Sequence, residues 1–316
     1  MTSSTGSEIE VPEALVSWHR RFFGEGGRAW IEAAPNLAAD LLDRWQLRAD
    51  GTPTSGAVAL VIPVRRTDGT PAVLKLQPVT DETVGEPDAL RAWGGNGAVR
   101  LLAHDATTGS MLLERLDADR SLATVGDDLV ALQHLSELLA RLSAVAAPSG
   151  LRRLSEIGAE MLGRVPRVLT LVPDPQRRLI QACASALAEV LPDTGDRLLH
   201  WDLHYGNVLA PHPADPREPW LAIDPKPLAG DPGFELLAAL HNRWQDAVAT
   251  GNVVRAIRRR FDLMTDALGL ERGRATAWTL ARVLQNALWD AERNDAMWNT
   301  EPDRLIAQTL LDTPPH

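Results

Sequence analysis

The chain has very little of several residue types, and each shortage excludes a class of protein. Cys183 is the only cysteine, so an intrachain disulfide and a cysteine-based zinc site are both excluded. Positive charge is not in excess, because 32 Lys and Arg face 42 Asp and Glu, a net charge of −10. That balance argues against nucleic acid or an anionic membrane as a partner, since both require a basic face. No apolar run approaches the about 18 residues of a membrane-spanning helix.

Lysine is the scarcest cation, since Lys75 and Lys226 are the only two. Met1 to Glu10 has neither a basic start nor an apolar core, so we expect no secretory signal and a cytoplasmic protein. The 316 residues are 45% hydrophobic and 23% charged, which is typical of a folded globular chain. This length is enough for two lobes of ordinary size.

Residues 1–116 predict leading helices and then a small sheet. Ala14 to Trp45 has helical patterning interrupted by glycines, which we interpret as helices broken by a glycine loop. Alternating apolar residues predict strands, and Asp68-Gly69 predicts a hairpin between the first two. The order is strand, strand, helix, strand, strand, over Ala57–Arg65, Ala72–Leu76, Pro87–Trp93, Val99–Leu102 and Ser110–Leu116.

The rest of the chain, residues 117–316, is mostly helical in pattern. Leucines at three- and four-residue steps from Leu132 to Leu142 predict one buried helix face, and Trp278 to Trp289 predicts another helix. One short β-like region lies between Arg197 and Asp224, and we expect a linker at Asp117 to Asp119. The predicted fold class is therefore α+β, with a small sheet-containing lobe followed by a larger helical lobe.

The densest chemistry lies in HWDLHYGNVL, which begins at His200, and in the apolar run that ends at Asp224. If the two runs on either side of the proline-rich turn pair as a hairpin, Asn207 and Asp224 lie near one end of it, and Asp202 lies in the same loop. Carboxylate and amide oxygens are the ligands that Mg²⁺ prefers. A carboxylate that the metal does not need is available to orient or deprotonate a hydroxyl.

This pattern, H-x-D-x-x-x-x-N followed by I-D, resembles the bilobal protein-kinase-like fold and its small-molecule branch, the aminoglycoside phosphotransferases. HWDLHYGNVL, EPWLAIDPKPLAGDPGFEL and ARVLQNALWD resemble the streptomycin 6-phosphotransferase group, which also includes hydroxyurea phosphotransferases. The resemblance covers most of the chain from about Val11. It implies phosphoryl transfer from ATP with Mg²⁺, streptomycin as the acceptor, and antibiotic inactivation as the role.

The resemblance also implies a role for each matching residue. Asp202 matches the catalytic aspartate, and Asn207 and Asp224 match the two magnesium ligands. Lys75 matches the lysine that contacts the α- and β-phosphates, and Glu86 matches its ion-pair partner. The remaining matches are the hinge backbone at Glu114 and Leu116, the structural histidine His200 and the structural aspartate Asp231.

The chain departs from the protein-kinase pattern in three ways. Ser55-Gly56-Ala57 has one glycine where protein kinases have three, so it is a poor glycine-rich loop. Pro225 follows Asp224 in place of Phe-Gly, which makes a flipping aspartate doubtful. Residues 225–233 contain no Ser, Thr or Tyr, which argues against control by loop phosphorylation and against a platform for peptides.

A streptomycin-like acceptor carries guanidinium groups, so we expect an acidic and partly aromatic pocket for a small cationic molecule. We also expect a monomer. Asp202 would contribute to the pocket, and Trp289 and Glu292 share a helix face with Gln285. The candidates are His204, Glu235, Trp289, Asp290 and Glu292.

Simpler structural interpretations stay open for several of these residues. Lys75 could be an edge-strand lysine that blocks aggregation, and Asp202 and Asn207 could cap turns. Trp289 could be core rather than pocket, and Arg258 to Arg260 predict a solvated helix face. At the level of function, the alternatives are a kinase for hydroxyurea, an amino sugar or a metabolite, and an inactive nucleotide-binding pseudokinase. The full set of kinase residues argues against the pseudokinase.

Overall fold

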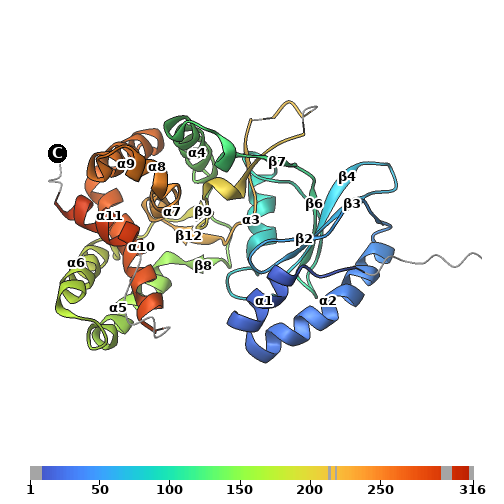
Figure 1. The fold of residues 1–316 in the computed structure, drawn as a ribbon, viewed down its shortest axis with the longest axis horizontal. Helices are drawn as coiled ribbons and strands as arrows, with labels where there is room; N and C mark the ends of the chain where they lie inside the picture. Colours follow the sequence, from blue (N-terminus) through green and yellow to red (C-terminus); the bar gives the residue numbers. More distant parts are fainter. Residues whose placement is uncertain (1–8, 213–214, 218, 293–300, 313–316) are drawn as a thin grey trace, which may run out of the picture. The chain divides into compact units, whose positions relative to one another are not determined.

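The structure, a computed structural model, describes residues 9–212, 215–217, 219–292 and 301–312 (Figure 1). Most of the segment on which the expectation of no secretory signal rests, residues 1–8, lies outside the described residues. The chain divides into two compact units. We call residues 1–95 with 99–116 the amino-terminal unit, and residues 96–98 with 117–316 the carboxy-terminal unit.

The amino-terminal unit begins with two helices, α1 (Glu13–Phe22) and α2 (Gly24–Arg44). The expected glycine loop between them is wrong, because Gly24 starts α2 and the chain changes direction at Phe23. Gly27 lies where the two helices pack closely, and a Cβ there would be 2.6 Å from the His19 carbonyl oxygen. Glycine is therefore retained inside a helix despite its cost, because only glycine permits this approach.

The six-stranded sheet of this unit has the order β1-β3-β4-β6-β5, with β2 paired to β3. The hairpin predicted at Asp68 is confirmed, and the Asp68 carboxylate accepts the Thr70 backbone N–H at 2.9 Å. The alternate apolar residues of β3 are buried and pack with α1 and α2, which lie along one side of the sheet (Figure 1). The strands are β1 (Arg48–Ala49), β2 (Thr54–Ser55), β3 (Leu60–Arg65), β4 (Pro71–Leu76), β5 (Leu101–Asp105) and β6 (Ser110–Glu114).

Helix α3 (Glu86–Trp93) follows β4, as predicted. It carries Glu86 in its first turn, and it ends at Gly94, whose φ of 58° is the left-handed conformation that favours glycine at a helix end. The first long strand starts later than expected, at Leu60, because residues 56–59 form a turn between β2 and β3.

The carboxy-terminal unit is mainly helical, and the leucines of its first helix are buried as their spacing predicts. None of the described helices combines the length and the apolar character needed to cross a bilayer. The α-helices are α4 (Asp128–Leu142), α5 (Leu154–Leu169), α6 (Asp174–Val190), α7 (Leu236–His241), α8 (Trp244–Ala249), α9 (Val253–Leu268), α10 (Arg272–Glu292) and α11 (Glu301–Leu311). Short 3₁₀ helices are η1 (Leu122–Thr124), η2 (Tyr205–Asn207) and η3 (Pro232–Glu235).

Two small sheets in this unit hold the polar loops. The linker expected at residues 117–119 lies where the carboxy-terminal unit resumes, and this segment forms part of β7 (Asp117–Ser121), which pairs with β10 (Val208–Ala210). The hairpin inferred from the sequence is confirmed, since β10 pairs antiparallel with β11 (Leu221–Ala222). The second sheet has the order β8-β12-β9, formed by β8 (Arg152–Arg153), β12 (Leu228–Gly230) and β9 (Arg197–Leu199).

Candidate active site

Lys75 and Glu86 form a buried ion pair in the amino-terminal unit. The Lys75 ammonium donates to both carboxylate oxygens of Glu86, at 2.6 and 2.8 Å, and the two residues are 4% and 0% exposed. Gln77, the residue directly after the end of β4, donates its side-chain amide to Glu86 at 2.6 Å. The pair is thus fixed by a third side chain that the sequence did not single out.

The hinge candidates end β6 and the amino-terminal unit. The Glu114 backbone N–H donates to the Arg100 carbonyl at 3.0 Å, and its carboxylate accepts the Arg100 N–H at 2.7 Å. The N–H of Glu114 is therefore occupied within the protein, so only its carbonyl could meet an adenine edge. Leu116 is the last residue before the carboxy-terminal unit.

Asp202 and Asn207 lie on the connection between β9 and β10. The Asn207 side-chain amide donates to the Asp202 carbonyl at 2.9 Å, which leaves the amide oxygen as the acceptor of that side chain. The Asn207 carbonyl accepts the Ile223 N–H at 2.9 Å, so Asp224 follows directly beside Asn207. The hairpin therefore brings together the residues that the sequence predicted would converge.

Two buried side chains, those of His200 and Glu235, form hydrogen bonds with the backbone at and next to this loop. His200 lies with Nε2 at 3.0 Å from the Ile223 carbonyl, and burial lowers the pKa of its imidazole to about 3, so it is neutral. Both carboxylate oxygens of Glu235 accept the Trp201 backbone N–H, at 3.0 and 2.9 Å. Trp201 has a φ of 66°, which is unfavourable for a non-glycine residue. Glu235 therefore holds the strained residue directly before Asp202.

The charges around Asp202 are incompletely balanced. Among the described residues, the Asp202 carboxylate has no hydrogen-bond or ion-pair partner. Burial raises its pKa, and the nearby charge of Asp224 adds to that effect, whereas Lys226 and His204 oppose it. The Lys226 ammonium lies 2.9 Å from an Asp224 carboxylate oxygen, so the second of the two lysines belongs to this cluster.

A divalent cation fits this loop only with help from a ligand. Within the described ranges, no three His, Cys, Asp or Glu side chains gather as a metal site. The Asn207 amide oxygen and the Asp224 carboxylate supply hard oxygen donors, which suit Mg²⁺. Since Mg²⁺ is usually bound by one or two carboxylates together with substrate phosphates, this small donor set fits a metal that arrives with a nucleotide.

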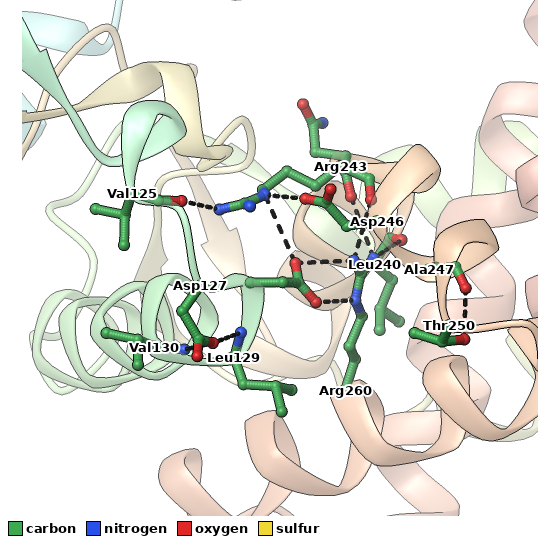
Figure 2. Close-up of polar contacts among 12 residues, drawn as sticks. Val125, Asp127, Leu129, Val130, Leu240, Arg243, Asp246, Ala247, Thr250 and Arg260 are labelled. Carbon is green, nitrogen blue, oxygen red and sulfur yellow. Dashed lines mark hydrogen bonds and ion pairs between the residues drawn. The ribbon is translucent and has the colours of Figure 1, made fainter.

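Asp231 and Arg243 connect the loop to the surrounding helices. Asp231 accepts the Gly233 N–H at 2.8 Å and the Arg274 guanidinium at 2.5 Å. Arg243, between α7 and α8, donates to the Val125 carbonyl at 2.7 Å and to Asp246 at 2.6 Å (Figure 2). Its guanidinium also lies 5.6 Å from the centre of the Tyr205 ring in η2.

Arg260 corrects one sequence prediction. It does not lie on a solvated helix face but is 2% exposed, and it forms a two-point ion pair with Asp128 at 2.8 and 3.0 Å. It also donates to the Arg243 carbonyl at 3.0 Å, which fixes the segment that carries the Arg243 side chain (Figure 2). Neither arginine was assigned a role from the sequence, because their partners are distant along the chain.

The residues predicted to line the acceptor pocket make contacts of different kinds in the structure. His204 accepts the Gly206 N–H on Nδ1 at 3.1 Å and so caps η2. Glu235 is 2% exposed and its carboxylate accepts the Trp201 N–H, so it is buried rather than in the expected pocket position. Glu292 pairs with Arg164 of α5 at 2.6 Å, and Asp290 is half-buried on α10. Trp289 meets the Trp201 ring edge-on at 6.1 Å, so it lies near the loop that carries Asp202.

Known proteins resemble this chain over nearly its whole length. Residues 44–294 match the family described as aminoglycoside/hydroxyurea antibiotic resistance kinase. A streptomycin 6-kinase of Streptomyces glaucescens is 57% identical over 93% of this chain and 94% of its own. A hydroxyurea phosphotransferase of Kitasatospora aureofaciens is 50% identical over 97% of this chain and 87% of its own.

Among solved structures, a thermostable mutant of the aminoglycoside phosphotransferase APH(4)-Ia in complex with ADP and hygromycin B has a similar fold. Its TM-score is 0.57 at 16% identity, over 87% of this chain and 99% of that one. The fold class expected from the sequence, α+β and protein-kinase-like, is confirmed.

Proposed function

Because this chain belongs to the aminoglycoside/hydroxyurea antibiotic resistance kinase family, we propose that it transfers the γ-phosphate of ATP to a hydroxyl group of streptomycin. The observation that carries the chemistry is the Asp202 carboxylate, which has no partner among the residues that the structure describes and shares a loop with Asn207, beside which Asp224 lies. The choice of acceptor is supported by the streptomycin 6-kinase at 57% identity.

In this proposal the amino-terminal unit binds the nucleotide. Lys75, oriented by Glu86, contacts the α- and β-phosphates, and the backbone at Glu114 and Leu116 meets the adenine edge. The turn between β2 and β3 takes the place of the glycine-rich loop. The Gly56 N–H is bonded to the Ala59 carbonyl within the turn, so the backbone N–H groups that follow Gly56 would meet the phosphates. Asn207 and Asp224 would hold Mg²⁺, which supplies positive charge to the phosphate oxygens when it is bound.

Asp202 would receive the hydrogen bond of the acceptor hydroxyl and align its oxygen with the γ-phosphorus. Phosphoryl transfer has a loose transition state, so alignment and charge neutralisation matter more than the strength of the base. The buried Glu235 and His200 keep the loop in one conformation, which limits the motion of Asp202. We assign His200 and Asp231 structural roles.

The test is an ADP-release assay with Mg²⁺ and ATP and a panel of streptomycin, dihydrostreptomycin, kanamycin, hydroxyurea and glucosamine, with the mass of each product recorded. A gain of one phosphate on streptomycin supports the proposal. Transfer to hydroxyurea alone selects the second candidate, which the relative at 50% identity favours. If none of these compounds is phosphorylated, the proposals of streptomycin and of hydroxyurea as acceptor are both contradicted. A cytoplasmic monomer without a nucleic-acid or membrane partner stays a prediction.

The acceptor pocket gives a sharper test, with Asp290 and Glu292 as its acidic members. Asp290→Asn with Glu292→Gln should raise KM for streptomycin much more than KM for ATP, because the acidic groups would contact only the cationic acceptor. Arg164→Gln is the matched control, since it removes the partner of Glu292 and leaves both acids in place. Equal changes in the two KM values would contradict an acidic pocket at this end of α10.

A further inference from the structure

His19 is a buried histidine that plays no part in the chemistry above. It lies on α1 with no exposed surface, and its Nε2 is 3.0 Å from the carbonyl oxygen of Val58, 39 residues away. A carbonyl can only accept, so Nε2 carries the proton and donates. Among the described residues, Nδ1 has no hydrogen-bond partner, so the bond to Val58 is the one polar contact of this ring that we find.

The ring of His19 is held in a single orientation. It stacks on Trp30 of α2, with ring centres 4.7 Å apart and planes 13° apart, and it meets Phe23 at 5.0 Å. The close packing of α1 and α2 at Gly27 keeps the backbone of His19 against α2. A buried donor with one partner and a fixed ring can therefore position the group that accepts from it.

That acceptor belongs to the turn between β2 and β3. Within the turn the Gly56 N–H donates to the Ala59 carbonyl at 3.0 Å, and Gly56 and Ala57 are exposed at its tip. Val58 lies between the exposed tip and the buried Ala59, so the hydrogen bond from His19 attaches to the part of the turn that faces the protein interior. Helix α1 lies wholly before residue 44, outside the segment that matches the family.

We propose that His19 is a positioning residue for nucleotide binding: its bond to the Val58 carbonyl holds the β2–β3 turn in the shape that presents backbone N–H groups to the phosphates of ATP. This inference rests on the proposed function, in which that turn replaces the glycine-rich loop. A turn with a single glycine lacks the usual close-fitting cradle, and a helix from elsewhere in the same unit supplies the missing constraint.

The experiment compares His19→Phe with His19→Gln. The phenylalanine keeps an aromatic ring on Trp30 and loses the donor, whereas the glutamine amide can still donate to Val58. In His19→Phe, amide hydrogen exchange of residues 56–59 in the ligand-free protein should accelerate about 3- to 10-fold, as expected for one lost hydrogen bond. The affinity for the ATP analogue AMP-PNP with Mg²⁺, measured by calorimetry, should fall by a similar factor of about 3 to 10.

In steady state, His19→Phe should raise KM for ATP and leave kcat and the acceptor KM within about twofold, because the bond orders a binding turn only. His19→Gln should restore both exchange and affinity. Leu15→Ala is the control for general destabilisation, because Leu15 is a buried residue of the same helix. If Leu15→Ala reproduces the pattern of His19→Phe, the effect is loss of stability and the inference is overturned.

Gly56→Ala tests whether the turn binds nucleotide, independently of whether His19 positions the turn. A Cβ at Gly56 meets no atom within 4 Å, so the unliganded protein should tolerate it, whereas phosphates lying on the turn would clash with it. Unchanged nucleotide affinity in Gly56→Ala would overturn the nucleotide role of the turn and of His19. Unchanged exchange at residues 56–59 in His19→Phe would overturn the positioning contact. Both readouts need no acceptor, so they stand even if no phosphate transfer is found.

Discussion

The Lys75–Glu86 pair of the amino-terminal unit and the Asp202 loop of the carboxy-terminal unit carry their charges differently. Lys75 and Glu86 neutralise each other at 2.6 Å, and Gln77 adds a further bond to the carboxylate. Beside the Asp202 loop, the Lys226 ammonium pairs with Asp224, and the Asp202 carboxylate has no partner among the described residues. The charges of Lys75 and Glu86, the first cluster, are balanced within the protein. The group formed by Asp202, Asp224 and Lys226, the second cluster, keeps an excess of negative charge, which would be available to a metal ion and a substrate hydroxyl.

Asp202→Ala tests the second cluster most strongly. We expect kcat to fall by about 10²–10⁴-fold, the range for loss of general-base help, while nucleotide affinity stays nearly unchanged. The fold should survive, because the carboxylate makes no contact that the described structure depends on. Steady-state kinetics and calorimetry with AMP-PNP measure the two effects. Turnover at the level of the unaltered protein would remove Asp202 from the mechanism and erase the contrast between the clusters.

Lys75→Met tests the first cluster through stability. Removing one partner of a buried ion pair leaves Glu86 charged and uncompensated, which should cost about 3–5 kcal/mol of unfolding free energy. The double variant Lys75→Met with Glu86→Gln should recover most of that stability without recovering ATP binding. Urea unfolding and calorimetry measure the two quantities. If the double variant is as unstable as the single one, the two residues do not act as a pair.

Glu235→Gln tests the buried support of the second cluster by its pH dependence. Burial raises the pKa of Glu235 from 4.5 to about 7, so the folded protein binds this proton more tightly than the unfolded chain. Stability is therefore lost as the pH rises from about 4.5 to about 7, by about 3 kcal/mol from this group.

In Glu235→Gln that loss should disappear, which makes the difference in unfolding free energy between pH 5 and pH 8 smaller by about 2.5 kcal/mol. Glu156→Gln is the matched control, because Glu156 is an exposed helix residue. Urea titrations at a series of pH values give the comparison. The same slope in all three proteins would show that Glu235 does not retain its proton in the folded state.

Lys226→Met should have the smallest effect. Burial raises the pKa of Asp202 and the charge of Lys226 opposes this, so removing the lysine should raise that pKa further. The acid limb of the kcat/KM profile should move to higher pH, with a loss at pH 7 of less than about tenfold, since a full pKa unit corresponds to a factor of ten. Lys226→Arg keeps the charge and should leave the limb in place. An unmoved limb in Lys226→Met would mean that this charge does not act on Asp202.

Local patterns in the sequence were sufficient to predict several structural elements. The hairpin at Asp68, the end of α3 at Trp93 and the β10–β11 pairing each depend on turn chemistry or on short-range periodicity, and all three were predicted. The candidate site depended on a spacing of residues within one loop, which is also local. The short strands β8 and β12 were missed, because two or three residues show no alternation.

Contacts between distant segments could not be predicted. Arg258 to Arg260 are consecutive, and successive helix residues point about 100° apart, so only one of them can face a given neighbour. Nothing nearby identifies Arg260 as that residue, because its partner Asp128 is 132 positions away. Glu235 was placed in the acceptor pocket for the same reason, since its contact with Trp201 spans 34 positions.

The burial of both lysines has a practical consequence for chemical labelling. Lys75 is 4% exposed and the Lys226 side chain is 12% exposed, and each ammonium lies against a carboxylate. Amine-directed reagents should therefore find little reactive lysine on the folded chain and two lysines on the unfolded one. Acylation followed by mass spectrometry would then report opening at two defined sites, each belonging to one of the charged clusters.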